Sequence, residues 1–332
     1  MAEKQWHPGQ LLEISGYYWK TCTLHAAVKL DVFTAIGEGR VPARELADRL
    51  NAGSDGLEWL LDALCALQLI RRHADGYENT PTSLAYLVST SPDYLGWMMM
   101  HHYHLVDAWH RLDEAVVSGG PVQAPASEAS PEWRQAFLKG MQTNARLQAP
   151  SVVSAIDLKE RKKLLDLGGG PATYAIHFCQ ANPGLSAIVF DLPDARPVAE
   201  ANIRAAGLSE RIGFQAGDFH QDTVSGRFDV VWLSHILHGE GPADGQKVVD
   251  LAVSALEPGG VVLVHDFILD DSRDGPEFPA LFSLNMLVGT RYGRAYSESE
   301  LKQMLSGAGM SAIERLDFRG PTDSGIIYGI KE

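Results

Sequence analysis

The sequence predicts an α/β protein in which a doubly wound, mostly parallel Rossmann-like sheet follows an α-helical winged-helix domain. Two observations predict the sheet. From residue 162 onward, short apolar segments alternate with amphipathic segments of helical period. One apolar segment, Leu164 to Leu167, leads directly into the glycine turn Gly168 to Gly170. A third observation predicts the winged helix, because three helical segments and a hairpin occupy the first 95 residues.

The N-terminal segment, residues 1–95, contains three stretches with apolar residues at helical spacing. Helices are expected at three places: 24–36, 42–50 and 57–69. A polar run from Arg71 to Thr80 follows them, and its Asp75-Gly76 pair predicts a tight turn between two short strands. Three helices followed by a hairpin is the element order of a winged-helix domain.

Residues 96–158 form the second predicted segment, a helical linker that also lines a substrate pocket. It contains three consecutive methionines, Met98 to Met100, and methionine side chains adapt to flat apolar ligands. Met98 and His101 are therefore candidate substrate-binding residues, although plain helix core explains any single one of them as well. Two further helices are expected in this segment: 132–148 and 150–158.

The third segment, residues 159–332, carries the predicted sheet. Strands are expected at 163–167, 186–190, 211–215, 228–233 and 260–266. Helices are expected between them at 171–181, 194–206 and 243–256. A last helix and two strands are expected at 297–307, 311–318 and 324–331. In an open parallel sheet, ligands bind beyond the carboxyl ends of the strands, so the functional site is expected there.

The composition is that of an ordinary globular protein, with 45% hydrophobic and 21% charged residues. A formal net charge of −14 argues against a nucleic-acid partner, which binds cationic surfaces. No apolar run approaches the ~20 residues that span a bilayer, and the N-terminus shows no signal pattern. The three cysteines lie far apart, which disfavours a disulfide framework. We therefore expect a cytoplasmic protein without a membrane span.

Polar residues and glycines follow the predicted strands at the edge where ligands bind. Taken singly, each of them is equally well explained as a helix cap or a turn residue. Five strands that all bring such groups to one edge are a stronger indication of a site. In chain order these groups are Asp166 to Gly170, Asp191, Asp218 and Phe219, Ser234 with His235 and His238, and Asp266.

The spacing of the glycine turn favours one class of cofactor. Dinucleotide-binding proteins have the pattern G-x-G-x-x-G, whose third glycine allows close packing around a pyrophosphate. Here Gly168 and Gly170 are present, but Thr173 occupies the third position. The carboxylate of Asp166 would repel a pyrophosphate and attract a cation. S-adenosylmethionine, a sulfonium without phosphate, therefore suits this turn better than NAD does.

The chain resembles, over nearly its whole length, the S-adenosylmethionine-dependent small-molecule O-methyltransferases of the plant caffeate and bacterial acetylserotonin type. The similar N-terminal segments are 27–33, 45–47, 60–64 and 79–81. The similar C-terminal segments are 166–170, 190–193, 217–219, 236–238 and 257–260. The resemblance implies a Rossmann-like methyltransferase sheet, a homodimer paired through the winged-helix domain, and a hydroxylated small molecule as methyl acceptor.

The resemblance also implies roles for individual residues in binding S-adenosylmethionine. Asp191 would hold the ribose hydroxyls, and Asp218 and Phe219 would flank the adenine. Gly168 would face the methionine part of the cofactor. The other expected cofactor-binding residues are Asp166, Gly169, Gly170, Leu192, Gly217, Ser234 and His235, with Phe137 and Met141 on a helix that covers the cofactor.

His238 falls on the catalytic base of the family, and Asp266 on the acidic residue that orients this base. A phenol has a pKa of ~10, so it needs a group such as neutral imidazole to take its proton as the oxygen attacks. Such general-base help contributes a factor of ~10²–10⁴ in rate. A structural histidine that caps the strand end is the alternative for His238. His235 is expected to be either a pocket residue or a competing base.

The chain departs from the plant pattern at three places. Gly239-Glu240 follow His238 where the plant proteins have Asp-Trp, and Ser234 replaces a lysine near the adenine. The second acidic residue of the family aligns with Ala295. These differences predict a weaker base. They also leave open a changed reaction on the same fold, such as C-methylation or hydroxylation-type chemistry.

The acceptor pocket is expected to have Phe282, Asn285 and Met286 as its second wall. No metal is expected, because the histidines between His101 and His110 lack matching cysteine or carboxylate ligands. A DNA-binding regulator is the less favoured function. Its recognition helix would carry Glu58 and no lysine or arginine, which makes poor phosphate contacts.

Overall fold

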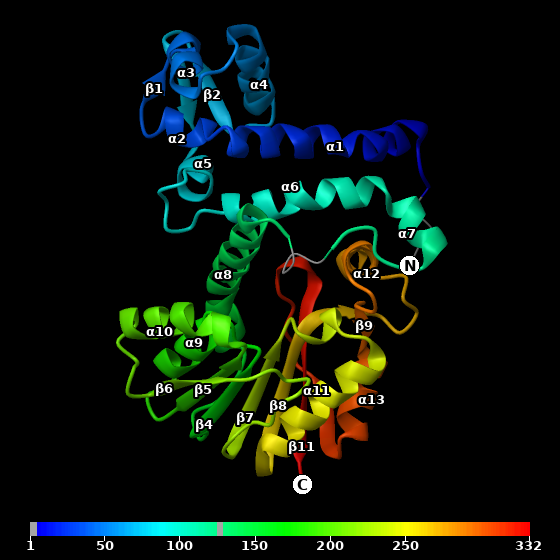
Figure 1. Cartoon of the computed structure of the whole chain (residues 1–332). Coiled ribbons are helices and arrows are strands. Elements are labelled where there is room, and N and C mark those ends of the chain that lie inside the picture. Colours follow the sequence, from blue (N-terminus) through cyan, green and yellow to red (C-terminus); the bar gives the residue numbers. More distant parts are fainter. Residues whose placement is uncertain (1–4, 125–128) are drawn as a thin grey trace. The chain divides into compact units, whose positions relative to one another are not determined.

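The computed structural model describes residues 5–124 and 129–332, which form two compact units. The first unit consists of Met1–Val106 and Ala129–Asn144, and the second of Asp107–Glu128 and Ala145–Glu332. Figure 1 shows the helices and strands of both units. The predicted boundaries at residues 95 and 158 stay a prediction.

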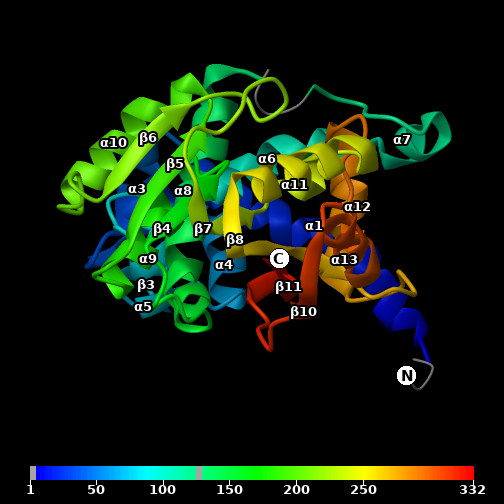
Figure 2. The same cartoon turned by 90° about the horizontal axis from the view of Figure 1, so that it is seen from below.

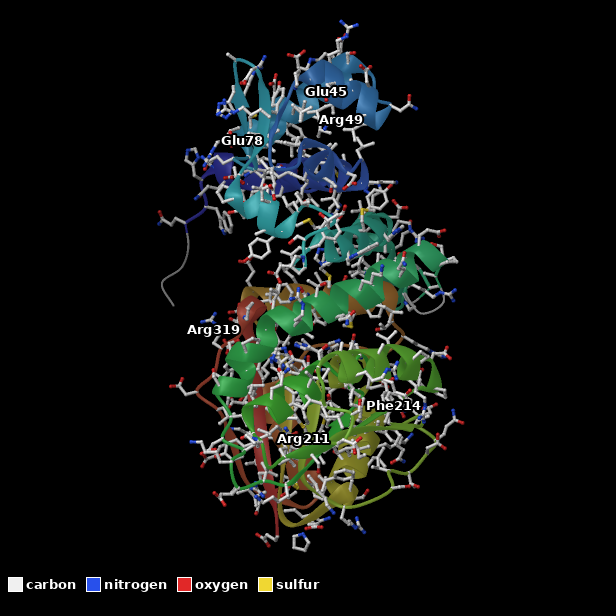
Figure 3. All side chains as sticks on the ribbon, turned by 90° about the vertical axis from the view of Figure 1, so that its left-hand side faces the viewer. Glu45, Arg49, Glu78, Arg211, Phe214 and Arg319 are labelled. Carbon is white, nitrogen blue, oxygen red and sulfur yellow. The ribbon has the colours of Figure 1, made fainter. Side chains whose placement is uncertain are left out.

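The first unit is a winged-helix domain with additional helices, as predicted. Its small sheet has the order β1-β3-β2, in which β2 and β3 form the expected antiparallel hairpin. Phe33, Leu46 and Leu61 are fully buried in its core. Surface ion pairs such as that between Arg49 and Glu45 lie on its outside (Figure 3). Its elements are α1 (Pro8–Lys29), α2 (Val32–Ile36), β1 (Arg40–Val41), α3 (Ala43–Leu50), α4 (Ser54–Ala66), β2 (Ile70–His73), β3 (Gly76–Asn79), α5 (Pro81–Tyr86), most of α6 (Gly96–His110) and the first part of α8 (Pro131–Ser154).

The expected helix at 24–36 was wrong in two respects. The structure divides it into α1 and α2, because Asp31 adopts a left-handed backbone conformation with φ of 58°. This turn brings Val28 of α1 and Phe33 of α2 into one core. In addition, α1 begins as early as Pro8. Its first half has no one-sided apolar pattern, since large apolar side chains such as Tyr18 are exposed, and so periodicity does not reveal it.

The second unit is the predicted doubly wound sheet, with strand order β10-β11-β8-β7-β4-β5-β6 (Figure 2). Five neighbouring strands, β6, β5, β4, β7 and β8, run parallel to one another. At the β8 side, β11 and then β10 are added in antiparallel orientation. A short strand, β9, pairs with the end of β8. The strands are β4 (Lys163–Leu167), β5 (Ser186–Asp191), β6 (Ile212–Ala216), β7 (Phe228–Ser234), β8 (Leu256–Leu269), β9 (Tyr296–Ser297), β10 (Met310–Arg315) and β11 (Ser324–Lys331).

Helices cover both faces of this sheet, which explains the continuous apolar strands. Leu164 and Trp232 pack on the face covered by the end of α8, α9 (Thr173–Ala181) and α10 (Arg196–Ala205). Leu165 and Leu233 pack on the other face, under α11 (Pro242–Ala255) and α13 (Glu298–Gly307). Arg211 (Figure 3) donates hydrogen bonds to the carbonyls of residues 179, 182 and 185, which fixes the turn between α9 and β5.

The expectation of two helices at 132–148 and 150–158 was wrong, because α8 runs without interruption from Pro131 to Ser154 and contains Pro150. A proline ring removes one helical hydrogen bond but fits the φ of a helix. Here the neighbouring Ala149 and Val152 are fully buried in the core of the sheet. Burial of this helical face therefore outweighs the lost hydrogen bond.

Leu165 offers a test of the core under α11 and α13. Leu165→Ala should lower the free energy of unfolding by about 2–5 kcal/mol, since it removes buried methyl groups and leaves a cavity. Leu138→Ala is the matched control and should change it by at most about 0.5 kcal/mol, because Leu138 is 64% exposed. Urea unfolding followed by tryptophan fluorescence measures both. Equal losses in the two variants would contradict the packing described above.

Candidate active site

The carboxyl ends of the parallel strands gather the predicted site residues of the second unit at one edge. The glycine turn directly follows β4, Asp191 ends β5, and Ser234 ends β7. Asp266 lies in β8, whose pairing places Ser234 opposite His265. These neighbouring ends occur together because the strands run parallel and each crossover helix returns the chain to the opposite edge.

The glycine turn exposes bare backbone because its positions exclude side chains. Gly168 and Gly170 have φ of +75° and +48°, a region that favours glycine. A Cβ atom on Gly168 would lie 2.4 Å from the side chain of Ile236, and one on Gly169 would lie 2.5 Å from the carboxyl carbon of Asp166. A ligand can therefore approach the main chain closely at this turn.

Asp191 is tied to the glycine turn by its side chain. Its Oδ2 accepts a hydrogen bond from the amide of Gly170 and its Oδ1 one from the amide of Leu192, both at 2.7 Å. Burial raises the pKa of Asp191, and the amides of Gly170 and Leu192 oppose this rise. The carboxylate thus has a fixed position and retains lone pairs, so it can accept hydrogen bonds from a pair of ligand hydroxyls.

Asp166 lies beneath the turn and is only 2% exposed. Its Oδ2 accepts a hydrogen bond from the amide of Ala175 at 3.1 Å. Burial raises the pKa of Asp166 to about 7; the Ala175 amide lowers it, and the charge of Asp191 adds to the rise. A cation bound nearby would stabilise the ionised form, whereas a phosphate would destabilise it further.

These three features fit S-adenosylmethionine. The turn offers bare backbone, Asp191 offers a carboxylate for the two ribose hydroxyls, and Asp166 offers a negative charge for a cationic group. The same features do not fit a pyrophosphate, because two carboxylates lie beside the turn.

His238 and Asp266 form a hydrogen-bonded pair at the same edge. His238 lies in a short 3-10 turn (Leu237–Gly239) after β7, and its Nδ1 is 2.7 Å from Oδ1 of Asp266. The amide of His238 donates to Oδ2 at 3.2 Å, and the amide of Phe267 donates to Oδ1 at 2.8 Å. These three hydrogen bonds hold the side chains of His238 and Asp266 in one arrangement.

The charge of Asp266 determines the proton position on His238. Burial alone would raise the pKa of Asp266, but His238 and His235 beside it hold the pKa well below its usual value. An ionised carboxylate only accepts hydrogen bonds, so Nδ1 of His238 carries the proton. The other ring nitrogen, Nε2, is therefore left with a lone pair that can take a proton.

Aromatic rings surround this pair. The ring of Phe282 meets His238 edge-on at 4.9 Å between centroids, and Phe267 stacks on it at 5.8 Å. Phe267 and Phe278 were missed from the sequence, whereas Phe282 was predicted. Phe278 lies on the same helix as Phe282, α12 (Glu277–Gly289), one turn earlier. That helical spacing, together with the position of Phe267 next to Asp266, was the signal that could have identified both residues.

Comparison with known proteins identifies the family. Residues 109–311 match the family model described as an O-methyltransferase domain, which is more than half of the chain. The chain belongs to this family. Residues 12–89 match the O-methyltransferase dimerisation domain, which supports the predicted homodimer.

Individual relatives agree with this assignment. The methyltransferase is 35% identical to a 3-hydroxy-5-methyl-1-naphthoate 3-O-methyltransferase of Streptomyces sahachiroi, over 98% of this chain and 95% of the relative. It is 33% identical to the tetracenomycin polyketide synthesis 8-O-methyl transferase TcmO of Streptomyces glaucescens, over 95% and 94%. Human N-acetylserotonin methyltransferase in complex with SAM superimposes with a TM-score of 0.87 at 27% identity, over 100% and 99% of the chains.

The predicted activity, cofactor and fold are thereby confirmed: the protein is an S-adenosylmethionine-dependent O-methyltransferase. Among the described residues, no helix has the length and apolar character needed to cross a membrane. The cytoplasmic location stays a prediction.

Some predicted site residues belong to the first unit, and their roles stay predictions. Met98, His101, Phe137 and Met141 lie on α6 and α8 within that unit. Inside it, the rings of His101 and Phe137 are 5.1 Å apart, and Nε1 of Trp133 donates to Nδ1 of His101 at 2.9 Å. Burial, with His102 and His104 nearby, lowers the pKa of His101 to about 4.

The predicted acceptor wall lies on α12. Asn285 is held by Trp109, whose Nε1 donates to its amide oxygen at 3.0 Å. Trp109 was not predicted, because 176 residues separate the two and only the folded chain brings them together. Met286 follows Asn285 on the same helix, and α12 packs against α7 (Leu112–Ser118).

The departures from the plant pattern have visible consequences. Ser234 contacts Nδ1 of His265 at 3.0 Å, and Nε2 of this buried histidine contacts Oγ of Ser324 at 3.1 Å. Ala295 is fully buried and brings no charge to the site.

Asp218, a predicted adenine-binding residue, accepts hydrogen bonds from the amide of His220 and from the side chain of Gln221, and these bonds order the loop after β6.

The ribose assignment of Asp191 can be tested by substitution. Asp191→Ala should weaken S-adenosylhomocysteine binding by about 10- to 100-fold, since hydrogen bonds to a charged group contribute about 1.5–3 kcal/mol. Titration calorimetry measures the dissociation constant. Asp194→Ala, at an exposed position three residues later, is the matched control and should bind as the wild type does. Unchanged affinity in Asp191→Ala would reject the assignment.

The raised pKa of Asp166 predicts how cofactor affinity depends on pH. Its pKa is about 7 without a ligand, so most of this carboxyl is protonated at pH 6 and ionised at pH 8. If only the ionised form attracts the cationic cofactor, the affinity for S-adenosylmethionine should rise about tenfold over this range. In Asp166→Asn the rise attributable to this group should vanish. The same pH dependence in the wild type and in Asp166→Asn would show that ionisation of Asp166 does not affect cofactor binding.

Proposed function

We propose that this methyltransferase transfers the methyl group of S-adenosylmethionine to a hydroxyl of a flat, largely apolar small molecule, with His238 as general base and Asp266 as the residue that orients it. One observation carries this proposal: the 2.7 Å contact between Nδ1 of His238 and Oδ1 of an ionised, buried Asp266. It leaves Nε2 of a neutral imidazole as the proton acceptor.

The reaction needs a base because a neutral hydroxyl is a weak nucleophile. When bound, S-adenosylmethionine supplies a methyl group activated by its sulfonium charge. His238 takes the hydroxyl proton on Nε2 while the oxygen forms its bond to the methyl carbon and the carbon–sulfur bond breaks. The negative charge of Asp266 then stabilises the imidazolium, as the aspartate of a serine-protease triad does. Positioning the two reactants in line contributes up to ~7–11 kcal/mol in addition.

The cofactor would be held by the edge of the sheet. Asp191 would bind the ribose hydroxyls, Asp166 would face the cationic part, and Asp218 and Phe219 would flank the adenine. Further contacts are proposed for Gly168, Gly169, Gly170, Leu192, Gly217, Ser234 and His235. The resemblance to the family makes Phe137 and Met141 additional candidates for cofactor binding. The hydrogen bond from the amide of Gly170 to Oδ2 of Asp191 supports this arrangement, because it holds the carboxylate beside the glycine turn.

A fused aromatic compound is the acceptor that the site supports best. The rings of Phe267 and Phe282 lie beside His238 and favour a flat apolar molecule. Met286 and Asn285 would form the opposite wall, and the run of methionines in the sequence makes Met98 and His101 further candidates for acceptor binding. Two relatives are named for a hydroxynaphthoate and for a tetracenomycin polyketide, which supports an aromatic hydroxyl as the methylated group.

The winged-helix domain is proposed to pair two copies of the chain. Helix α1 exposes a set of large apolar side chains that suits a protein partner. These side chains are Leu11, Leu12, Ile14, Tyr17, Tyr18 and Trp19. Helix α4, which would read DNA in a regulator, contains Glu58 and Asp62 and no lysine or arginine, so nucleic acid is not a proposed partner.

His238→Gln tests the general base. Turnover of a naphthol-type acceptor should fall by about 10²- to 10⁴-fold, because the proton acceptor is lost, while S-adenosylhomocysteine affinity stays within about twofold. Mass spectrometry of the product should show the gain of one methyl group on oxygen. His73→Gln, a histidine beside Glu78 in the first unit, is the matched control. Turnover of His238→Gln near that of the wild type would reject the role of His238.

A further inference from the structure

We propose that His235, His238 and Asp266 also form a binding site for one divalent transition-metal ion, Zn²⁺ in particular. Each of the three residues offers one ligand atom, and these atoms all lie within 4.8 Å of one another. In the described part of the chain, no other group of three histidine, cysteine or acidic side chains comes so close together.

One metal ion could bind once the ligand atoms shift, because the contact between His238 and Asp266 must lengthen and that between His235 and Asp266 must shorten. Nδ1 of His238 lies 2.7 Å and Nδ1 of His235 lies 3.7 Å from the same carboxylate atom, Oδ1 of Asp266. Ligand atoms that bind one tetrahedral Zn²⁺ at about 2.0–2.1 Å are about 3.3 Å apart. Two imidazoles and one carboxylate are also a ligand set of catalytic zinc sites, which keep a further position open.

The methyl transfer proposed above gives His235 a contact to the cofactor but no proton to carry. Its Nδ1 is buried, 3.7 Å is too long for a hydrogen bond to Asp266, and no other described group bonds to this atom. A buried polar atom without a partner is unfavourable, by about 1–3 kcal/mol. A metal ion between His235 and Asp266 would give this atom its missing partner.

The backbone of His235 supports a specific placement of its ring. Its φ is 55°, in the left-handed region that costs a side-chain-bearing residue about 1–2 kcal/mol. Its amide donates to the carbonyl of His265 at 2.8 Å, which holds this conformation. Such strained residues cluster at binding and catalytic sites.

The third histidine nearby does not join the site. The ring of His265 lies 4.6 Å from that of His235, but both of its nitrogens are engaged, with Ser234 and with Ser324. The ring of Phe267 lies 4.6 Å from that of His235, and the ring of Phe282 lies 4.9 Å from that of His238. The ligand set is therefore limited to two imidazoles and one carboxylate.

Metal binding would switch the proposed base off. If Nδ1 of His238 binds the ion, the proton of the neutral imidazole sits on Nε2, which then donates and cannot take the hydroxyl proton. The ion would also occupy the carboxylate that orients His238. This effect on turnover rests on the proposed function, whereas binding of the ion does not.

Cobalt binding tests the site independently of turnover. Untagged enzyme, stripped with a chelator, is titrated with Co²⁺ and followed by the visible absorption of the bound ion. We expect one Co²⁺ per chain in the wild type, displaced by Zn²⁺, and an affinity at least tenfold weaker in His235→Phe. The substitution keeps an aromatic ring beside Phe267, and circular dichroism checks the fold. His73→Gln is the matched control, because His73 has Glu78 at 2.7 Å but belongs to no such group of three.

Zn²⁺ inhibition is then measured relative to the chelator-treated activity of each protein. The wild type and His73→Gln should be inhibited at concentrations at least tenfold lower than His235→Phe. Equal Co²⁺ binding by the wild type and His235→Phe, or no binding at all, would overturn the metal site. Site-specific Co²⁺ binding that leaves turnover intact would confirm the site and instead reject His238 as the base.

Discussion

The parallel alignment of β4, β5, β7 and β8 is the constraint on which the site depends. It brings to one edge residues that are far apart in the chain, and hydrogen bonds then fix them there. Asp191 fastens the end of β5 to the glycine turn after β4, and Asp266 of β8 fastens the turn after β7 that carries His238. Cofactor edge and base are thus parts of one hydrogen-bonded framework.

Three carboxylates at this edge, two of them buried and that of Asp191 half-buried, differ in pKa because their neighbours differ. Asp166 and Asp191 are met by backbone amides, which do not fully offset burial, so their pKa values are raised. Asp266 accepts from two backbone amides as well but also lies beside two imidazoles, and its pKa is lowered. A nearby cation would stabilise the ionised forms of Asp166 and Asp191. Asp266 stays ionised without one and keeps the tautomer of His238 fixed. The edge therefore discriminates against phosphate-bearing cofactors.

Much of the fold could be predicted from the sequence, for a physical reason. Strands that are buried on both faces appear as continuous apolar runs, and β4 begins and ends where the sequence indicated. The long helix α1 escaped detection because it has no one-sided apolar face, and Pro150 suggested a break that tertiary packing overrides. Most site residues of the sheet could be predicted because they follow the ends of predicted strands. The left-handed backbone of His235 and the bond between Trp109 and Asn285 arise only from the folded chain.

The position of β11 has a consequence for how the enzyme is made. This strand is translated after every other strand of the sheet, yet it lies between β8 and β10 and not at an edge. It also supplies Ser324, which contacts His265 beneath Ser234. Until β11 has emerged from the ribosome, β8 is unpaired along one side, and such an exposed strand edge invites aggregation. Chaperone protection of this edge until β11 has paired should therefore raise the yield of active enzyme.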